Sequence, residues 1–217
     1  MTYPTTGSET ELRAVNQILM SVGQAPVTRI EKTNPDVAIC FETLMEVSRE
    51  VQSEGWTFNR EYGVAFTPDA NKNIKYPKNA LAIDISNSYV QYAGNGTAVG
   101  FNGRKYDTVK RGDKVYDRRR HSYDWDETIY CDVKWLWDWD ELPIPIQDYI
   151  TAKAATVVSS RIVGDPNQYQ ILQQKEAYMR AWVIEYETQQ GDYNYMHDPR
   201  YEDNYRHYEP MDVLRRY

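Results

Sequence analysis

The sequence has few of the residues and runs that identify metal-binding or membrane proteins. It has two cysteines, Cys40 and Cys131, and neither lies near a histidine or a second cysteine at metal-ligand spacing. We therefore expect both thiols to be free and buried. No apolar stretch approaches the roughly 20 residues that cross a bilayer, and residues 1–5 lack the charged and apolar segments of a signal peptide. The sequence therefore predicts no insertion into a membrane.

Motifs for catalysis and cofactor binding are also scarce. No glycine pattern typical of a dinucleotide fold or a P-loop occurs. The three histidines are His121, in a basic turn, and His197 and His207, in a polar tail. None belongs to a His-x-x-x-His pair or stands beside a serine elbow, so a surface or interface role suits them better than proton transfer. We predict no catalytic residue, no cofactor and no metal site.

Acidic residues outnumber basic ones, and tyrosine is the compositional outlier. The 32 Asp and Glu exceed the 25 Lys and Arg, which gives a net charge of −7. This balance argues against a protein whose whole surface binds nucleic acid. The chain has 19 Tyr and 6 Trp but 4 Phe. Tyr and Trp suit half-wet interfaces, where they dominate binding energy, but tyrosine is also favoured in strands, and composition leaves both explanations open.

Basic residues concentrate in one segment, residues 104–120, with eight Lys and Arg against three Asp. A basic patch on an acidic protein suits an acidic partner surface or passing DNA, because charge complementarity steers encounter. We favour a protein partner, because the segment lies in a β region that we expect to face outward. The alternative is a solvated loop without a partner. The candidate interface residues here are Arg111, Arg118, Arg119 and Arg120.

The last 27 residues, 191–217, have six tyrosines, four arginines and six acids but almost no aliphatic side chains. Such a segment cannot build a core of its own. It is either disordered in the isolated chain or laid across a neighbouring subunit, and we favour the second. Its candidate interface residues are Tyr193, Tyr195, Tyr201, Tyr205, Tyr208, Arg215 and Arg216.

Four amphipathic helices are expected, in the ranges 8–23, 34–55, 144–164 and 165–191. Ser8 can cap the first, Asn34 caps the second with Pro35 in its first turn, and Gly55 stops the second. The third follows two prolines that forbid continuation of the preceding strand. The expected core face of the fourth helix consists of Tyr169, Leu172, Met179, Trp182, Val183 and Tyr186.

Between the second and third helices, alternating runs rich in Tyr, Val and Ile predict strands. The expected strands cover 63–67, 80–86, 88–93, 97–101, 104–109 and 128–137, with a tight hairpin at Asn102-Gly103. The segregated helices and strands predict an α+β fold. It has a four-helix core from the N- and C-terminal segments (1–55 plus 142–191), an inserted antiparallel β domain (56–141) and an extended tail (192–217).

Acids and tryptophans alternate near the end of the β region. Glycoside hydrolases use two carboxylates across a sugar that stacks on aromatic rings. The simpler explanation is strand alternation followed by an acidic turn that leads to the next helix. The residues concerned are Trp125, Trp135, Trp137 and Trp139 with Asp124, Asp126, Glu127, Asp138, Asp140 and Glu141.

Several short runs resemble, in order and spacing, the tail tubular protein A family of short-tailed phages. Two are at the start, Ala14 to Val27 and Glu50 to Asn59. The others are Tyr116-Asp117-Arg118, Trp139 to Pro143, Tyr149 to Ala154, Glu185-Tyr186-Glu187 and Gly191 to Asn194. The resemblance extends over residues 10–196. The β region is longer than in that family, and nothing matches from about His197 onward.

The resemblance implies a structural virion protein of T7-like podoviruses that forms a dodecameric adaptor ring between the portal protein and the nozzle (tail tubular protein B). The implied location is the tail at the head-tail junction, after assembly in the host cytoplasm. The ring would form part of the DNA ejection channel, pass genomic DNA without sequence-specific binding, and offer a tail-fibre attachment surface. The alternative function is a polysaccharide-degrading glycoside hydrolase, or an adaptor with added hydrolase activity, that uses the tryptophans and acids at 124–141.

Overall fold

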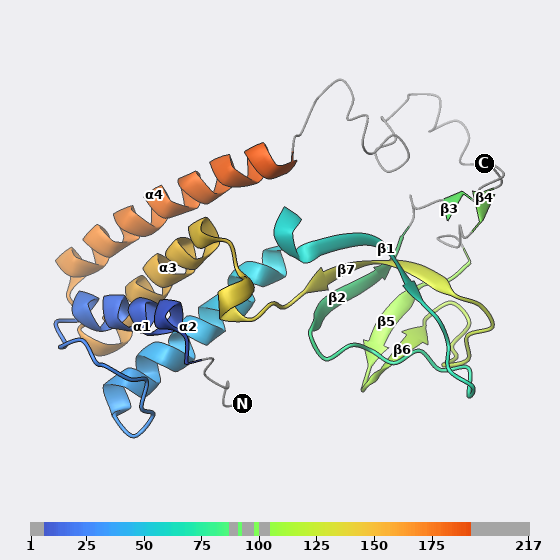
Figure 1. The fold of residues 1–217 in the computed structure, drawn as a ribbon, viewed down its shortest axis with the longest axis horizontal. Coiled ribbons are helices and arrows are strands. Elements are labelled where there is room, and N and C mark those ends of the chain that lie inside the picture. Colours follow the sequence, from blue (N-terminus) through green and yellow to red (C-terminus); the bar gives the residue numbers. More distant parts are fainter. Residues whose placement is uncertain (1–6, 87–90, 93–97, 100–104, 192–217) are drawn as a thin grey trace. The chain divides into compact units, whose positions relative to one another are not determined.

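The computed structural model describes residues 7–86, 91–92, 98–99 and 105–191 (Figure 1). They form two compact units. The helical unit is built from residues up to 59 together with 136–191, and the β unit includes residues 60–135. Helices in one unit and antiparallel sheets in the other confirm the predicted α+β class. The predicted tail and the Asn102-Gly103 hairpin lie outside the described residues.

The helical unit has four helices, α1 (Glu9–Ser21), α2 (Pro35–Glu54), α3 (Ile144–Ile162) and α4 (Pro166–Gly191), and two short 3₁₀ turns, η1 (Thr57–Asn59) and η2 (Trp139–Glu141). The predicted caps are confirmed. The Ser8 hydroxyl accepts a hydrogen bond from the backbone N–H of Glu11, and the Asn34 side chain accepts one from Asp36. Gly55 ends α2 with φ +81°, a left-handed conformation that favours glycine.

α3 is the central helix of this unit. It packs against α4 on one side and against α1 and α2 on the other (Figure 1). Because it has neighbours on several sides, even its small and hydroxyl residues are buried, among them Ala152, Thr156 and Ser159. The helices before the β unit and those after it therefore build one core together.

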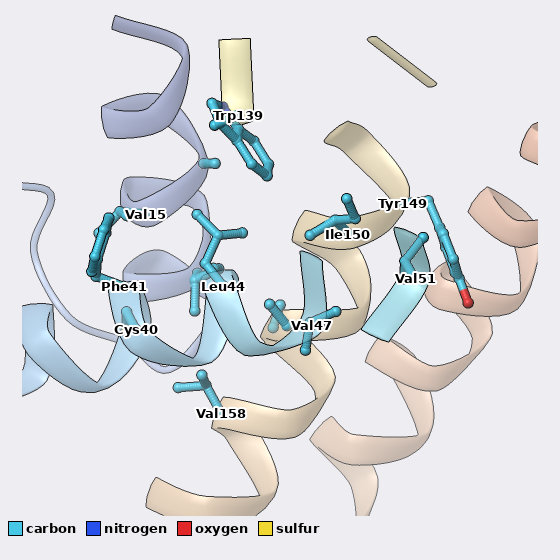
Figure 2. Close-up of a cluster of buried hydrophobic side chains, with 14 of the residues drawn as sticks. Val15, Cys40, Phe41, Leu44, Val47, Val51, Trp139, Tyr149, Ile150 and Val158 are labelled. Atoms are coloured by element: carbon cyan, nitrogen blue, oxygen red, sulfur yellow. The ribbon is translucent and has the colours of Figure 1, made fainter. Parts of the chain in front are cut away.

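Apolar side chains from α1, α2 and α3 meet in that core, as Figure 2 shows for Val15, Phe41, Leu44 and Ile150. Cys40 lies among them, and both cysteines are free and buried, as predicted. One buried amide joins the two chain segments of the helical unit. Gln52 donates from Nε2 to the Trp137 carbonyl at 3.1 Å and accepts from the Trp137 N–H at 2.8 Å.

The β unit contains a three-stranded antiparallel sheet in the order β1 (Arg60–Phe66), β7 (Ile129–Trp135), β2 (Ala80–Ile85). β7 alternates as predicted, with Ile129, Cys131 and Val133 fully buried. Two further antiparallel pairs join β3 (Gln91–Tyr92) to β4 (Ala98–Val99), and β5 (Thr108–Arg111) to β6 (Lys114–Asp117).

The β5–β6 hairpin corrects one prediction. A strand over 104–109 is wrong at its start, because residues 105–107 precede the strand and Tyr106 is buried against the ring of Trp125, with 5.3 Å between centroids. The strand begins at Thr108 and turns back at Gly112-Asp113, where Gly112 has φ +64°. Burial alternates on both sides of this start, with Tyr106 and Thr108 buried and Asp107 and Val109 half-buried, but the pairing with β6 begins only at Thr108.

Candidate interaction surfaces

The predicted basic patch is divided between two places on the β5–β6 hairpin. Arg111 and Lys114 are paired beside the Gly112-Asp113 turn, whereas Thr108 and Asp117 are paired at the other end. Arg118, Arg119 and Arg120 follow Asp117, so more than three residue steps, roughly 10 Å, separate them from Arg111. Of the four candidate arginines in this segment, the three consecutive ones therefore form one local group and Arg111 lies apart.

This arginine turn, residues 118–122, is fixed by a buried carboxylate. Asp117 is fully buried, and its Oδ1 accepts hydrogen bonds from the backbone N–H groups of Asp107 (3.2 Å) and Arg119 (2.9 Å). The backbones of Asp117 and Ser122 exchange N–H···O bonds of 3.0 and 3.3 Å, and His121 has φ +52°. The exposed arginines therefore project from a defined turn.

Ion pairs neutralise much of the charge in the basic segment. Arg118 donates to Asp107 Oδ2 from Nε and Nη2, at 2.9 and 2.8 Å. Arg120 pairs with Asp126 at 2.9 Å, and Lys105 pairs with Glu127 at 2.6 Å. Arg111 instead stacks on the ring of Tyr116, 3.7 Å from its centroid. The basic excess visible in the sequence is thus balanced in part by acids from neighbouring segments.

The same contacts set the acidity of two carboxyl groups in the tryptophan and acid cluster. The Lys72 ammonium and the Arg120 guanidinium lower the pKa of Asp126. The Lys105 ammonium and the Tyr106 hydroxyl lower the pKa of Glu127. A glycosidase general acid needs a raised pKa, so neither residue is suited to that task.

The tryptophans of the cluster also differ from a sugar-binding platform. Trp125 and Trp139 are buried, and Trp125 donates from Nε1 to the Val115 carbonyl at 3.1 Å. Trp135 belongs to the β unit, where its Nε1 donates to Glu61 at 2.7 Å, whereas Trp137 packs on the core of the helical unit. The simpler explanation, alternation and a capping turn, fits these positions. Asp138 and Glu141 indeed form a capping box at η2.

A row of glutamates along α2 was not foreseen from the sequence. They recur every fourth residue and so share one side of the helix. Each pairs with a base from a different position in the chain, at 2.9 to 3.2 Å. The pairs are Glu42–Lys32, Glu46–Arg161, Glu50–Lys153 and Glu54–Arg180. The i, i+4 spacing was the available signal, although it does not identify the partners.

The last of these ion pairs, Glu54–Arg180, joins α4 to α2. Arg180 donates to both carboxylate oxygens of Glu54, at 3.1 and 2.9 Å, and to the hydroxyl of buried Tyr149 at 2.7 Å. Further along α4, the Glu187 carboxylate accepts from the backbone N–H and the hydroxyl of Thr57, each at 2.8 Å. Near its start, Gln168 donates to the Ser21 carbonyl. Polar contacts therefore hold α4 at three positions.

Apolar packing of α4 is limited, which corrects the predicted core face. Val183 is the one fully buried residue of α4, and Leu172 and Met179 are partly buried against the same core cluster. Tyr169 and Trp182, which we expected in the core, are 38% and 43% exposed. On a helix with 3.6 residues per turn, Trp182 lies about 100° from Val183, too far to share its direction.

Large apolar side chains form a stripe on the exposed side of α4. Ile171, Tyr178 and Trp182, spaced by seven and four residues, lie within about 40° of one another around the helix. We call them the outer stripe. Ile171 is 67% and Tyr178 72% exposed. Exposed apolar groups of this size in a cluster are typical of an interaction site.

Other predicted features rest on the described residues only in part. Within these residues no group of three or more His, Cys, Asp or Glu could hold a metal ion. Nor does any helix among them have the length and apolar character to span a membrane. The candidates Tyr193, Tyr195, Tyr201, Tyr205, Tyr208, Arg215 and Arg216 lie outside the described residues.

Comparison with known proteins gives two matches. A family model described as "Tail tubular protein" matches residues 12–193. The chain is also 27% identical over 175 residues to "Tail tubular protein A" of Klebsiella phage KP34, an alignment that covers 77% of this chain and 82% of that protein. Both matches extend over the helical unit and the β unit.

Proposed function

The chain belongs to the tail tubular protein family, as a structural component of a phage virion tail, and from this premise we propose that it forms the adaptor ring between portal and nozzle. In this proposal twelve copies close a ring at the head-tail junction, after assembly in the host cytoplasm. The ring binds the portal protein on one side and the nozzle protein, tail tubular protein B, on the other. The ring holds the portal and the nozzle together and gates the DNA channel, and it does not catalyse a reaction.

The structural observation that carries this proposal is a set of large apolar side chains that the helical unit leaves exposed. Ile171, Tyr178 and Trp182 project from α4, and Ile144 at the start of α3 is 70% exposed. Tyrosine, tryptophan and isoleucine of this kind belong in the desolvated centre of a protein interface. A ring subunit buries such surfaces when it meets its neighbours and the portal.

Charge supports the channel that the ring would enclose. With a net charge of −7, the protein repels the phosphates of DNA more than it attracts them. DNA that moves during ejection needs a wall without tight binding sites, and contacts with it would be independent of base sequence. Acidic residues therefore suit the inside of the ring.

The arginine turn is our candidate for tail-fibre attachment. Asp117 fixes the turn, and Arg118 and Arg120 pair with acids at their flanks but stay at the surface. Acidic side chains on a fibre could replace Asp107 and Asp126 as partners of these arginines at little cost in free energy, because exposed ion pairs are weak. Arg119 adds a third guanidinium to this attachment surface.

The experiment for the ring is the native mass of the purified chain, alone and mixed with the portal protein of the same virus, by light scattering on a sizing column. We expect a stable complex with one adaptor for each portal subunit. A chain that stays monomeric and elutes apart from the portal would contradict the adaptor function. The acids and tryptophans at 124–141 would then be worth a screen against bacterial surface glycans, with D138N and E141Q as comparison variants.

A further inference from the structure

We propose that the outer stripe of α4 is the surface against which a second copy of this chain packs in the assembled tail. This inference rests on the proposed ring and specifies which face of the subunit makes the ring contact. The three large apolar side chains of the stripe have mostly uncharged neighbours on the same side of α4. These neighbours include Gln174, Ala181 and Gln189, with Lys175 and Glu185 as the charged ones.

Exposed apolar side chains on other helices of the same unit make a copy of the chain a suitable occupant. Met20 on α1 is 56% exposed and Ile39 on α2 is 41% exposed. α3 lies between these two helices and α4, so Met20 and Ile39 belong to helices on the other side of α3 from the outer stripe (Figure 1). A head-to-tail contact joins two different surfaces and generates a ring, whereas a two-fold dimer needs one self-complementary surface.

The size of the stripe explains why such a contact would form on the portal. The stripe extends from Ile171 to Trp182, roughly 17 Å along the helix, and with a width of about 10 Å it offers a face on the order of 170 Å². A stable interface buries about 800 Å² on each partner. The stripe alone is therefore too small for a tight dimer in solution. Copies held side by side on a portal ring need less contact area to stay together.

The test compares two charge-matched double variants with the unaltered chain. I171E/Y178E places two carboxylates on the stripe, and Q170E/Q173E places two on exposed positions of the same helix away from it. Far-UV circular dichroism first establishes that both variants keep the helical content of the unaltered chain. Assembly with the portal protein is then followed by light scattering on a sizing column.

We expect I171E/Y178E to need at least ten-fold more protein to form the full complex, while Q170E/Q173E assembles like the unaltered chain. Equal assembly of all three would overturn this inference and leave the adaptor function intact. Failure of the unaltered chain to assemble with the portal overturns both. The two hypotheses therefore fail in different ways.

Cross-linking distinguishes a second copy from the portal as the occupant of the stripe. Equal amounts of ¹⁴N- and ¹⁵N-labelled chain are assembled on unlabelled portal and treated with a carbodiimide, which joins Lys175 to a nearby carboxylate. We expect mixed-isotope links from the Lys175 peptide to peptides within residues 9–54. Assembled complexes in which Lys175 gives no mixed-isotope link, or links to the portal alone, would contradict the proposal.

Discussion

Single side chains in this protein are controlled mainly by burial and by their nearest charges. Burial raises the pKa of the Cys40 thiol to about 11, with a smaller contribution from Asp36. Burial also raises the pKa of Cys131, and the carboxylates of Asp132 and Asp84 add to the effect. Both thiols therefore stay protonated, and so unreactive, across the pH range in which free cysteines ionise.

Iodoacetamide at pH 8 should therefore alkylate the two thiols of the folded protein at least about 100-fold more slowly than those of the denatured chain. The raised pKa of Cys40 also makes the free energy of unfolding depend on pH. The stabilisation by the protonated thiol is fully present below pH 9.0, the pKa in the unfolded chain, and is lost as the pH rises toward about 11, the pKa in the folded protein.

Mass spectrometry of quenched samples measures the alkylation rate. Q173C, which adds an exposed thiol on α4, provides the control and should react rapidly. If Cys40 or Cys131 reacted as fast as the thiol of Q173C, the described burial would be wrong.

At the scale of elements, α2 and α4 differ in the interactions that hold them in the helical unit. α2 buries Phe41, Leu44 and Val51, and its row of glutamates also forms ion pairs. α4 buries Val183 alone and depends on polar contacts at Gln168, Arg180 and Glu187. The stability of α4 should therefore respond to the loss of one polar group more strongly than that of α2.

R180M tests this dependence. It removes hydrogen bonds to Glu54 and to the buried Tyr149 hydroxyl, and we expect a loss of about 1–2 kcal/mol in the free energy of unfolding. The lower part of the usual range for charged hydrogen bonds applies, because Arg180 and Glu54 are partly exposed. Urea unfolding followed by circular dichroism at 222 nm measures the change. R49M, at an exposed position on α2, is the matched control and should lie within about 0.5 kcal/mol of the unaltered chain.

Features that depend on neighbouring residues in the sequence could be predicted, whereas features that depend on distant residues could not. Ser8, Asn34 and Gly55 act on their own neighbours, so the helix ends were predictable from sequence. Tyr106 was placed wrongly because its position depends on Trp125, a partner distant in sequence. Trp182 was placed wrongly because the sequence did not show which side of α4 faces the core. The partners of the α2 glutamates, such as Lys153 and Arg161, were unpredictable for the same reason. In the arginine turn, the charges were visible but their pairing with Asp107 and Asp126 was not.

At the scale of the whole molecule, the helical unit closes its core without side chains from the described part of residues 60–135. Every residue of that core, from Ala14 to Val183, lies outside this range. Gln52 and Trp137 are hydrogen-bonded to each other just before and just after the insertion. A short connection can therefore join the two chain segments of the helical unit.

Replacing residues 60–135 with a Gly-Ser linker of about eight residues should leave a folded helical protein. We expect a cooperative thermal transition by circular dichroism at 222 nm, because the apolar core remains complete. V158D in the same shortened chain places a charge in that core and should abolish the transition. A shortened chain that melts without cooperativity would show that the helical unit depends on the β unit.

The division of the helical unit by an insertion has a consequence for synthesis. α1 and α2 leave the ribosome before residues 60–135, and α3, which covers their apolar sides, follows only after them. At about 5–20 residues per second, this interval is on the order of 4–15 s. During it the β unit can fold by itself, while α1 and α2 expose Val15, Phe41 and Leu44 to solvent. The nascent chain is therefore most prone to aggregate, and most dependent on chaperones, before its third helix emerges.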